Sequence, residues 1–577
     1  MTYRPPVDDI LFTMTQVALP PGTAPAMERG DLVAILEESA RFCEERVAPL
    51  DRTSDTEGAK WVDGVVTCPP GFKEAYADWA TAGWNAVAQP EEFGGSGLPT
   101  SVGTATMEML TSSCLALSTL PVLSQGAADA IEAHASDALK AKYLAKLVSG
   151  EWTGTMNLTE PQAGSDLALL RTKAVPVGDG THRITGQKIF ITFGEHDLAE
   201  NILHLVLARL PDAPPGVKGI SLFLVPKFFV DDEGRLGAMN DLRCAGIEHK
   251  LGIKGSPTCT MVYGDAGGAI GWLIGEENKG LACMFTMMNK ARLATGLQGV
   301  AIAEKATQKA AAYVLERRQG RAEGISGTAP IAAHPDVART LARMKALTAA
   351  ARAIAHTAAA AIDGAHAAET AEARAAHDLR AGLLTPIVKA FSTDVGVEVA
   401  SLGIQLHGGM GFIEETGAAQ LLRDIRIAPI YEGTNAIQAI DLVMRKMGRD
   451  GGADVARVIA ECRADVDRGR ALLGPSAARL DAAIDALETA SAHLLSPNVS
   501  DTDKLLVAQT HLRLFGLTLG GALLTRGAVA AGEAEAHWPR LARVFAEDLA
   551  VEAASLLAQI LSPDRRAEDY RALAGMA

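Results

Sequence analysis

The chain has few aromatic residues and no paired cysteine motif. Phe, Trp and Tyr make up 5% of its 577 residues, whereas alanine is abundant in the second half. This combination predicts long helices that pack through small side chains. The absence of any CxxC pair argues against a disulfide scaffold or a zinc site and suits a reducing compartment. The cysteines are seven scattered residues: Cys43, Cys68, Cys114, Cys244, Cys259, Cys283 and Cys462.

Basic residues are in the minority. The sequence has 54 Lys and Arg against 69 Asp and Glu, a formal net charge of −15. Because a basic surface supplies most of the affinity of nucleic-acid-binding proteins, we expect no nucleic-acid partner. A local basic pocket for an anionic ligand remains compatible with this balance.

A leader segment and a long apolar run are also missing. The first residues (MTYRPPVDDILFTMTQ) contain no basic region followed by an apolar core, so no signal peptide is expected. The most apolar run, residues 514–524, is bounded by Arg513 and Arg526 and is shorter than the ~20 residues that span a bilayer. We therefore expect a soluble, cytoplasmic protein without integral membrane insertion.

The length predicts about four domains at ~150 residues each, and the texture of the sequence changes three times. We predict an α+β fold that is mostly α. The expected parts are an N-terminal segment and helical domain (1–155), a middle β domain (156–280), a helical bundle (281–446) and an additional C-terminal helical domain (447–577). The Ala-rich residues 340–376 read as bundle helices.

The middle region contains short β-rich runs with Gly and Pro between them. Such spacing predicts a small antiparallel barrel or sandwich. No βαβ alternation and no GxGxxG after a strand are present, which weakens a nicotinamide-dehydrogenase interpretation. The runs are residues 182–185, 188–192, 202–207 and 220–225.

Three motifs carry the chemistry: MNLTEPQAGSD (156–166) followed by GQKIFIT (186–192), then QLHGGMGF (405–412), then IYEGTN (430–435). With these motifs in this order, residues ~30–446 resemble the acyl-CoA dehydrogenase family of flavoproteins. The resemblance implies FAD as cofactor and a helical domain, a β-barrel and a four-helix bundle in that order. The segments PVDDILFT and GFIEETGAAQ (411–420) are most similar to the branch that includes 3-methylmercaptopropionyl-CoA dehydrogenase.

Glu432 is the candidate catalytic base. Removing two hydrogens across Cα–Cβ of an acyl thioester requires a base for the α proton and donors to the thioester carbonyl. The family's catalytic glutamate occupies the position of Glu432, next to Gly433, and its backbone N–H contacts the thioester oxygen. The alternative for an isolated Glu is a surface-loop carboxylate. Some members place the base before a helix arginine, but that position here is Ala291.

The resemblance also implies substrate contacts. Arg292 matches an arginine that shapes the electrostatics of the base loop, the alternative being a surface arginine in a salt bridge. Asn289 stands where the family's substrate-proximal aspartate falls. Ser165 matches a position near the flavin phosphate and CoA, although Ser165-Asp166 is also a common capping pair.

Further positions match the flavin contacts of the family. Phe190 stands where Trp is more usual, and the alternative for it is an ordinary core aromatic. Arg317 matches an arginine that neutralises the pyrophosphate. The loop with Gln405, Gly408 and Gly409 matches one that meets the dinucleotide part from a neighbouring subunit. The positions that match isoalloxazine contacts are Met156, Leu158, Thr159, Phe190, Thr192 and Thr434.

Three further residues depart from the family pattern. Asn157 replaces a small residue, Gln420 replaces a Lys or Arg while Asp424 is in place, and Ala436 stands where a polar residue is common. None is the base. We expect the first two either to reduce flavin affinity or to be features of the branch. No metal site is expected.

Three functions are compatible with these motifs. The first is an FAD-dependent acyl-CoA dehydrogenase that forms trans-2-enoyl-CoA and passes electrons to an electron-transfer flavoprotein. The second is an acyl-CoA oxidase that releases hydrogen peroxide, and the third is a binding protein that has lost catalysis. The branch suggests a short thioether acyl-CoA substrate. We expect a homo-oligomer, a dimer being favoured, whose surface the last 131 residues cover without a direct part in the chemistry.

Overall fold

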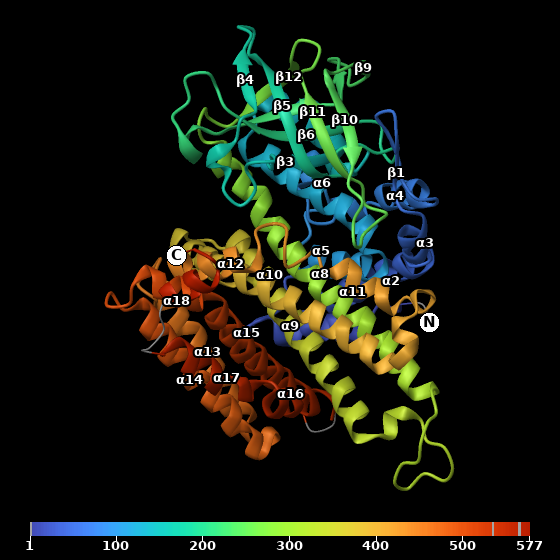
Figure 1. Cartoon of the computed structure of the whole chain (residues 1–577), viewed down its shortest axis with the longest axis vertical. Helices are drawn as coiled ribbons and strands as arrows, with labels where there is room; N and C mark the ends of the chain where they lie inside the picture. The colour runs from blue at the N-terminus through green and yellow to red at the C-terminus, as the bar shows by residue number, and fades with distance from the viewer. Residues whose placement is uncertain (1–2, 533–535, 563–566, 577) are drawn as a thin grey trace. The chain divides into compact units, whose positions relative to one another are not determined.

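The computed structural model describes residues 3–532, 536–562 and 567–576, which fall into two compact units (Figure 1). Unit 1 contains Pro6–Glu37 and Thr295–Ala577, and unit 2 contains Glu38–Ala294. The helices α2 (Arg29–Phe42) and α8 (Gly280–Glu316) contribute residues to both units. Helices dominate the secondary structure, and strands concentrate in the middle of the chain, so the predicted fold class is confirmed.

The first part of unit 2 is helical, and α6 is its central helix. Most residues of α6 are buried, from Leu115 through Ile131, as expected for a core helix. Gly154 on the first strand of the sheet lies so close to α6 that a Cβ there would be 2.4 Å from Ala127 Cβ. The helices are α3 (Leu50–Glu57), α4 (Phe72–Thr81), α5 (Thr100–Ser113), α6 (Leu115–His134) and α7 (Asp137–Ser149).

A small hairpin interrupts these helices and is absent from the sequence-based prediction. Strands β1 (Lys60–Val62) and β2 (Val65–Thr67) pair antiparallel around Asp63 and Gly64. Both turn residues have positive φ, 48° and 90°. An Asp-Gly pair is a strong local signal for such a turn, so the hairpin could have been predicted.

The rest of unit 2 is an eight-stranded sheet in the order β10-β11-β5-β12-β7-β6-β3, with β4 beside β5. A bridge between Lys173 and Arg209, just after β6, links β4 to β6, so β5, β12, β7, β6 and β4 form a ring. The strand pairs are antiparallel except β3 with β6, and the bridge between Lys173 and Arg209 is also parallel. The strands are β3 (Thr153–Asn157), β4 (Lys173–Pro176), β5 (Thr181–Thr192), β6 (Ile202–Ala208), β7 (Ser221–Pro226), β10 (Leu242–Ile247), β11 (Thr258–Tyr263) and β12 (Ala269–Ile274); β8 (Phe228–Val230) and β9 (Leu236–Met239) form a separate hairpin.

Two predicted strands are one strand in the structure. Residues 182–185 and 188–192 both belong to β5, which continues through Gly186. A Cβ at Gly186 would lie 2.5 Å from Thr172 Oγ1, so the glycine permits a close approach and does not end the strand. The strands predicted at 202–207 and 220–225 correspond to β6 and β7.

Unit 1 is helical. Its longest helices are α9 and α10, which pack against each other. The predicted helical stretch 340–376 is broken at residues 368–370, where Thr370 accepts a hydrogen bond from Ala373 N (3.1 Å) and caps α10. The helices are α1 (Val7–Phe12), α9 (Pro335–Ala367), α10 (Ala371–His407), α11 (Ala418–Ile425), α12 (Asn435–Asp441), α13 (Ala453–Leu473), α14 (Ala477–Leu495), α15 (Asp501–Ala531), α16 (His537–Asp548), α17 (Ala553–Ile560) and α18 (Ala567–Leu573).

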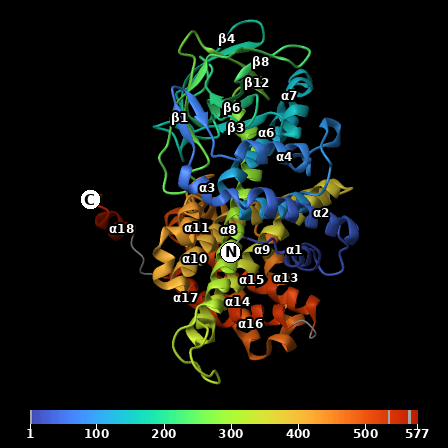
Figure 2. The same cartoon turned by 90° about the vertical axis from the view of Figure 1, so that its right-hand side faces the viewer.

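The helix α15 lies at the centre of the additional C-terminal residues, with α13, α14 and α16 against it (Figure 2). It contains the apolar run 514–524 and extends beyond it on both sides to a length of 31 residues, so the helix is longer than the run considered in the sequence. By length and composition α15 qualifies as a membrane-spanning candidate. However, 78% of its most apolar window is buried inside the protein, as for a core helix.

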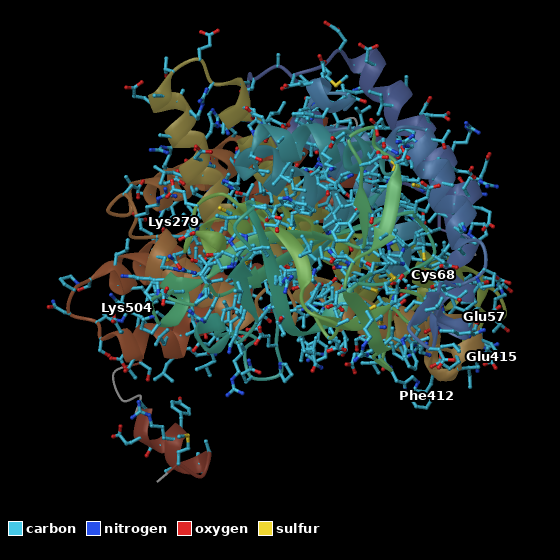
Figure 3. All side chains as sticks on the ribbon, turned by 90° about the horizontal axis from the view of Figure 1, so that it is seen from above. Glu57, Cys68, Lys279, Phe412, Glu415 and Lys504 are labelled. Carbon is cyan, nitrogen blue, oxygen red and sulfur yellow. The ribbon has the colours of Figure 1, made fainter. Side chains whose placement is uncertain are left out.

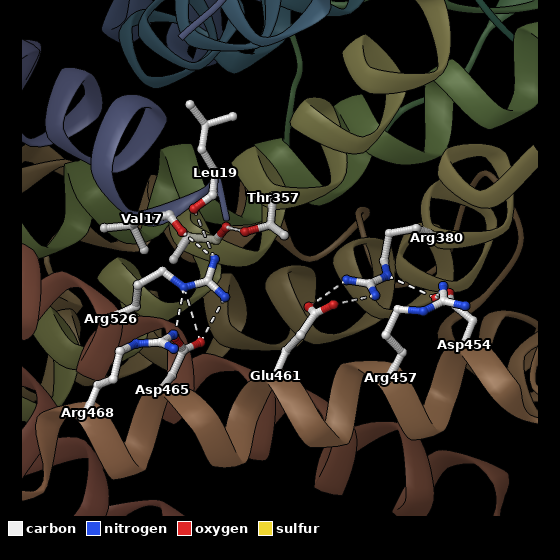
Figure 4. A network of polar contacts seen from close by, with 11 residues as sticks. Val17, Leu19, Thr357, Arg380, Asp454, Arg457, Glu461, Asp465, Arg468 and Arg526 are labelled. Atoms are coloured by element: carbon white, nitrogen blue, oxygen red, sulfur yellow. Dashed lines mark hydrogen bonds and ion pairs between the residues drawn. The ribbon is translucent and has the colours of Figure 1, made fainter. Parts of the chain in front are cut away.

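A mostly buried arginine joins the C-terminal residues to the N-terminal segment of unit 1 (Figure 4). Arg526 on α15 binds Asp465 on α13 (2.8 Å) and donates to the carbonyl oxygens of Val17 (3.0 Å) and Leu19 (3.3 Å). The side chains of Arg526 and Asp465 are 10% and 1% exposed. The N-terminal segment is therefore fixed to α15 by hydrogen bonds to its backbone.

A glycine contact fixes α15 against α10. A Cβ at Gly516 would lie 2.3 Å from Phe391 Cδ2, so no larger residue fits. We expect Gly516→Val to lower the free energy of unfolding by about 1–3 kcal/mol through overpacking. Denaturant unfolding of the variant would measure this. Gly30→Val is the matched control, because Gly30 is exposed, a Cβ there meets no atom within 4 Å, and its φ is not in the left-handed region.

Candidate active site

The loop from Pro429 to Asn435 connects α11 to α12 and has a strained backbone. Glu432 has φ = +57°, a left-handed conformation that is uncommon for any residue except glycine. Gly433 follows with φ = +82°. Such strain persists only where the surroundings fix the backbone, and it concentrates at functional sites. We call residues 429–435 the base loop.

Hydrogen bonds from the start of α12 hold the base loop. The backbone N–H of Asn435 donates to Pro429 O (3.0 Å), and Gln438 Nε2 donates to Glu432 O (3.2 Å). Thr434 is the N-cap of α12, its hydroxyl oxygen accepting from Ile437 N (3.2 Å). The cap uses a lone pair of this oxygen and leaves its O–H free to donate elsewhere.

A tyrosine anchors the middle of the base loop. The Tyr431 hydroxyl donates to Oε1 of Gln298 on α8. Burial raises the pKa of Tyr431, and the negative charge of Glu432 raises it further. Tyr431 therefore stays neutral at physiological pH. Glu432 is itself half-buried, as is suitable for a base that must meet both solvent and substrate.

The predicted substrate residues of α8 differ in exposure. Arg292 is 5% exposed and its guanidinium lies 5.9 Å from the centroid of the Phe285 ring, so it is not a surface arginine. Asn289 is exposed and Ala291 is buried. Ser165 is exposed in a loop of unit 2, and its neighbour Asp166 caps a short helical turn by accepting from Ala168 N (2.9 Å).

The predicted isoalloxazine residues of unit 2 meet where β3 ends and β5 ends. Met156 and Leu158 are half-buried against the core below. The carbonyl of Thr159 accepts from Ile189 N (2.9 Å), which joins the segment after β3 to β5. The hydroxyls of Thr159 and Thr192 form no hydrogen bond within the described part of the chain, so both can serve a ligand.

A β-bulge turns Phe190 outward. The pairing of β5 with β11 shifts between Lys188 and Ile191, so that two residues of β5 oppose one of β11. Phe190 lies in this bulge with φ = +61° and is 58% exposed. It is therefore not an ordinary core aromatic. Bulges of this kind redirect a side chain next to a site.

A buried ion pair beneath these residues was missed in the sequence. Nζ of Lys188 lies 2.9 Å from Oε1 of Glu160 and donates to Leu158 O (3.0 Å); both side chains are almost fully buried. Although burial opposes it, Lys188 together with hydrogen bonds from Thr172 and Arg171 lowers the pKa of Glu160 to about 2. Burial lowers the pKa of Lys188 to about 8. Both residues stand within the first motif, which was the available signal.

Asn157, which replaces a small residue of the family pattern, lies in the core of unit 2. Asn157 is fully buried, accepts from the Tyr263 hydroxyl (2.8 Å) and donates to Thr155 Oγ1 (2.7 Å). Thr155 Oγ1 lies 2.9 Å from Nδ1 of His204, whose pKa burial lowers to about 3. These hydrogen bonds hold β3, in place of the packing that a small residue at position 157 would provide.

The departure at Gln420 replaces a charged pair by an amide–carboxylate contact. Gln420 Nε2 lies 3.4 Å from Asp424 Oδ2 on α11, and both residues are buried. Ala436, on the first turn of α12, is half-buried.

The predicted dinucleotide residues of unit 1 lie at the C-terminal ends of α8 and α10, with Gln405 in the last turn of α10. The rings of Tyr313 and His407 stack with centroids 4.5 Å apart, which brings these two helix ends together. Arg317, Gln405, Gly408 and Gly409 beside this stack are all exposed. Phe412, which follows them, is 85% exposed and projects from the surface (Figure 3).

Sequence models of one family cover most of the chain. They are the acyl-CoA dehydrogenase N-terminal domain (residues 31–151), middle domain (155–266) and C-terminal domain (278–447). The chain belongs to the acyl-CoA dehydrogenase family. It is an oxidoreductase whose cofactor is FAD. A fourth model, acetyl-CoA dehydrogenase C-terminal like, matches residues 454–570.

Relatives of this acyl-CoA dehydrogenase include the 3-methylmercaptopropionyl-CoA dehydrogenase of Ruegeria pomeroyi, 48% identical over 96% of this chain and 97% of that protein. A broad-specificity linear acyl-CoA dehydrogenase of Mycobacterium tuberculosis is 35% identical over 81% and 79%. An acyl-CoA dehydrogenase of Bacillus anthracis complexed with FAD shares the fold at a TM-score of 0.77 and 20% identity, with 98% and 94% covered.

The residues present fit FAD. In unit 2, the exposed ring of Phe190 and the half-buried Met156 and Leu158 offer apolar surface, and the free hydroxyls of Thr159 and Thr192 offer donors. In unit 1, the exposed Arg317 and the backbone at Gly408, which has φ = +59°, suit a pyrophosphate. Within the described residues, no three His, Cys, Asp or Glu side chains gather as metal ligands.

Proposed function

We propose that this acyl-CoA dehydrogenase removes two hydrogens across Cα–Cβ of an acyl-CoA with Glu432 as the base. One observation carries the proposal: the only glutamate of the IYEGTN motif is held in a left-handed backbone conformation by its neighbours. A conformation this costly is retained where it orients a functional group.

The residues divide the chemistry between them. The Glu432 carboxylate takes the α proton, and its own backbone N–H donates to the thioester oxygen as enolate charge develops. Arg292 adds positive charge, and Asn289, Gly433 and Ser165 contact the substrate. Bound FAD supplies the acceptor for the hydride that leaves Cβ. The product is then the trans-2-enoyl-CoA, with the proton retained on the carboxylate.

The flavin residues keep the roles that the family resemblance implies. Thr159, Thr192 and the O–H of Thr434 hydrogen-bond the ring, on which Phe190 and Met156 pack. Arg317 neutralises the pyrophosphate of the dinucleotide. The other proposed contacts with FAD are Leu158, Ser165, Gln405, Gly408 and Gly409.

We propose 3-methylmercaptopropionyl-CoA as the substrate, supported by the 48% identical relative that carries this name. Anaerobic addition of this thioester is expected to bleach the flavin absorbance. Palmitoyl-CoA is expected to react with a kcat/KM at least about tenfold lower. A difference of a single methylene group in a hydrophobic pocket already changes kcat/KM by about tenfold or more, and the palmitoyl chain is many methylenes longer. A stopped-flow comparison with butyryl-, octanoyl- and palmitoyl-CoA measures this. A holoenzyme that none of the four bleaches would contradict the proposed function.

An electron-transfer flavoprotein is proposed as the acceptor, as the family resemblance implies. A chain from structural work on the electron transferring flavoprotein of Acidaminococcus fermentans shares the fold at 25% identity and a TM-score of 0.59, which supports this proposal. Release of hydrogen peroxide in air at rates near those with the flavoprotein would instead favour an oxidase.

A cytoplasmic homodimer is proposed as the working form. Sedimentation of the holoenzyme tests the dimer.

A further inference from the structure

The helix α12, which begins where the base loop ends, is held by side chains of α10. Asn435 is 7% exposed, and its amide nitrogen donates to Asp394 Oδ1 (2.7 Å) and Thr393 Oγ1 (3.0 Å). Its amide oxygen accepts from Nζ of Lys389 (2.8 Å), which is fully buried. Both ends of the amide are satisfied, so the side chain of Asn435 has a single favourable orientation.

The helix α15 of the additional C-terminal residues packs beside Asn435. It packs against both α12 and α10, and a small cavity of about 20 Å³ between the three helices is lined by Asn435, Leu512 and Arg513. Leu512 is 3% exposed, and Arg513 is fixed by Glu552 (2.7 Å). One turn along α15, Gly516 makes the tight contact with α10 described above.

Hydrogen bonds from α12 connect this network to Glu432, the residue with the left-handed backbone. The backbone of Asn435 closes the base loop on Pro429, and Gln438, one turn into α12, donates to the carbonyl oxygen of Glu432. A displacement of α12 therefore moves the backbone of Glu432 directly. Because a left-handed residue returns to an ordinary conformation unless it is constrained, the orientation of Glu432 depends on how firmly α12 is held.

We propose that Asn435 and Lys389, supported by Leu512 of α15, are positioning residues that hold Glu432 in the geometry for proton removal. The last 131 residues thus act on the chemical step through α12, beyond any role in covering a surface. The proposal rests on the proposed function of Glu432 as the base. It assigns to the C-terminal residues an effect that a purely structural domain would not have.

The test compares matched variants of the full-length FAD holoenzyme. Asn435→Ala removes the amide from the network, and Leu512→Ala removes the support from α15. Leu514→Ala is the control for the second, because Leu514 is also fully buried but lies about 200° around the axis of α15. Arg380→Met is the control for the first, because Arg380 joins α10 to Glu461 on α13 (2.8 Å) through a partly buried ion pair elsewhere.

Anaerobic single-turnover reduction by saturating 3-methylmercaptopropionyl-CoA, with and without deuterium at the α carbon, is the kinetic readout. Asn435→Ala and Leu512→Ala are expected to slow flavin reduction about 10- to 100-fold, since small misplacements of a reacting group have effects of that size. The isotope effect should rise, while flavin absorbance and substrate affinity stay as in the wild type. The two controls should melt at lower temperature and reduce the flavin at the wild-type rate.

Crystal structures of the two positioning variants give a readout that does not depend on turnover. Glu432 is expected to leave its left-handed conformation in both. Wild-type reduction rates, or an unmoved Glu432 backbone in both variants, would overturn the proposal. Loss of the proposed function would look different, because the wild-type holoenzyme would then not be reduced at all. If Asn435→Ala fails to fold, the comparison of Leu512→Ala with Leu514→Ala decides the matter.

Discussion

Glu432→Gln is expected to lower turnover by about 10²–10⁴-fold while the protein keeps its bound FAD. An amide at this position has nearly the size of the carboxylate but cannot accept the α proton, and general-base catalysis contributes rate factors of that order. The backbone contacts of the base loop, from Gln438 to Glu432 O and from Asn435 N to Pro429 O, do not involve the side chain. The flavin spectrum and the melting temperature should therefore change little.

Glu415→Gln is the matched control for this substitution. Glu415 lies in the exposed turn Glu414–Thr416, which precedes α11 (Figure 3). The substitution makes the same chemical change as Glu432→Gln but outside the base loop. Its flavin reduction by acyl-CoA should match the wild type. Retention of wild-type turnover by Glu432→Gln would exclude the carboxylate as the base. It would then direct attention to other groups, because Ala291 cannot take that role.

Much of the site could be predicted because the motifs are contiguous. The proposed base, the glycine after it and the capping threonine stand together in six residues, and the proposed isoalloxazine contacts of unit 2 stand in two short runs. The strands at 202–207 and 220–225 could be predicted because their apolar runs are bounded by Gly and Pro. The Asp63-Gly64 hairpin was overlooked despite an equally local signal.

The remaining features depend on contacts between residues distant in sequence. The contact of Lys389 with Asn435 joins positions 46 apart, and nothing in either segment alone indicates it. The bulge at Phe190 arises from the register of β5 against β11. The helix α15 continues on both sides of the apolar run 514–524, because the arginines that bound the run pair within the protein, Arg513 with Glu552 and Arg526 with Asp465. Side-chain pairing of this kind cannot be read from hydropathy.

Lys188→Met is expected to lower the free energy of unfolding by about 3–5 kcal/mol, the usual effect of removing one partner from a buried ion pair. The Glu160 carboxylate is 3% exposed, and hydrogen bonds from Thr172 and from the backbone of Arg171 compensate only in part. The lysine also donates to Leu158 O. The segment that bears Leu158 and Thr159 should therefore loosen, and FAD affinity should fall about tenfold, equivalent to ~1.4 kcal/mol.

Lys227→Met distinguishes this effect from general destabilisation of unit 2. Lys227 forms the other buried pair of the sheet, with Glu195 (2.5 Å), and does not contact the predicted flavin segments. It should lower the melting temperature without weakening FAD binding in a fluorescence titration. Equal FAD affinities for the two variants would show that the pair of Lys188 has no part in cofactor binding. The double variant Lys188→Met/Glu160→Gln should regain most of the stability, since it leaves no unpaired charge.

The pH dependence gives a second signature of the same pair. A carboxyl whose pKa is about 2 in the folded protein and 4.5 when unpaired stabilises the fold above about pH 4.5. That stabilisation, about 3 kcal/mol, is lost as the pH falls toward 2. Burial lowers the pKa of Lys188 to about 8, so loss of its proton above that pH relieves the cost of burying its charge and does not lower the stability of the fold. The difference in melting temperature between wild type and Lys188→Met should therefore narrow as the pH falls from about 5 toward 2. A difference that is constant from about pH 2 to 7 would mean that packing of the lysine chain, and not its charge, stabilises the flavin segment.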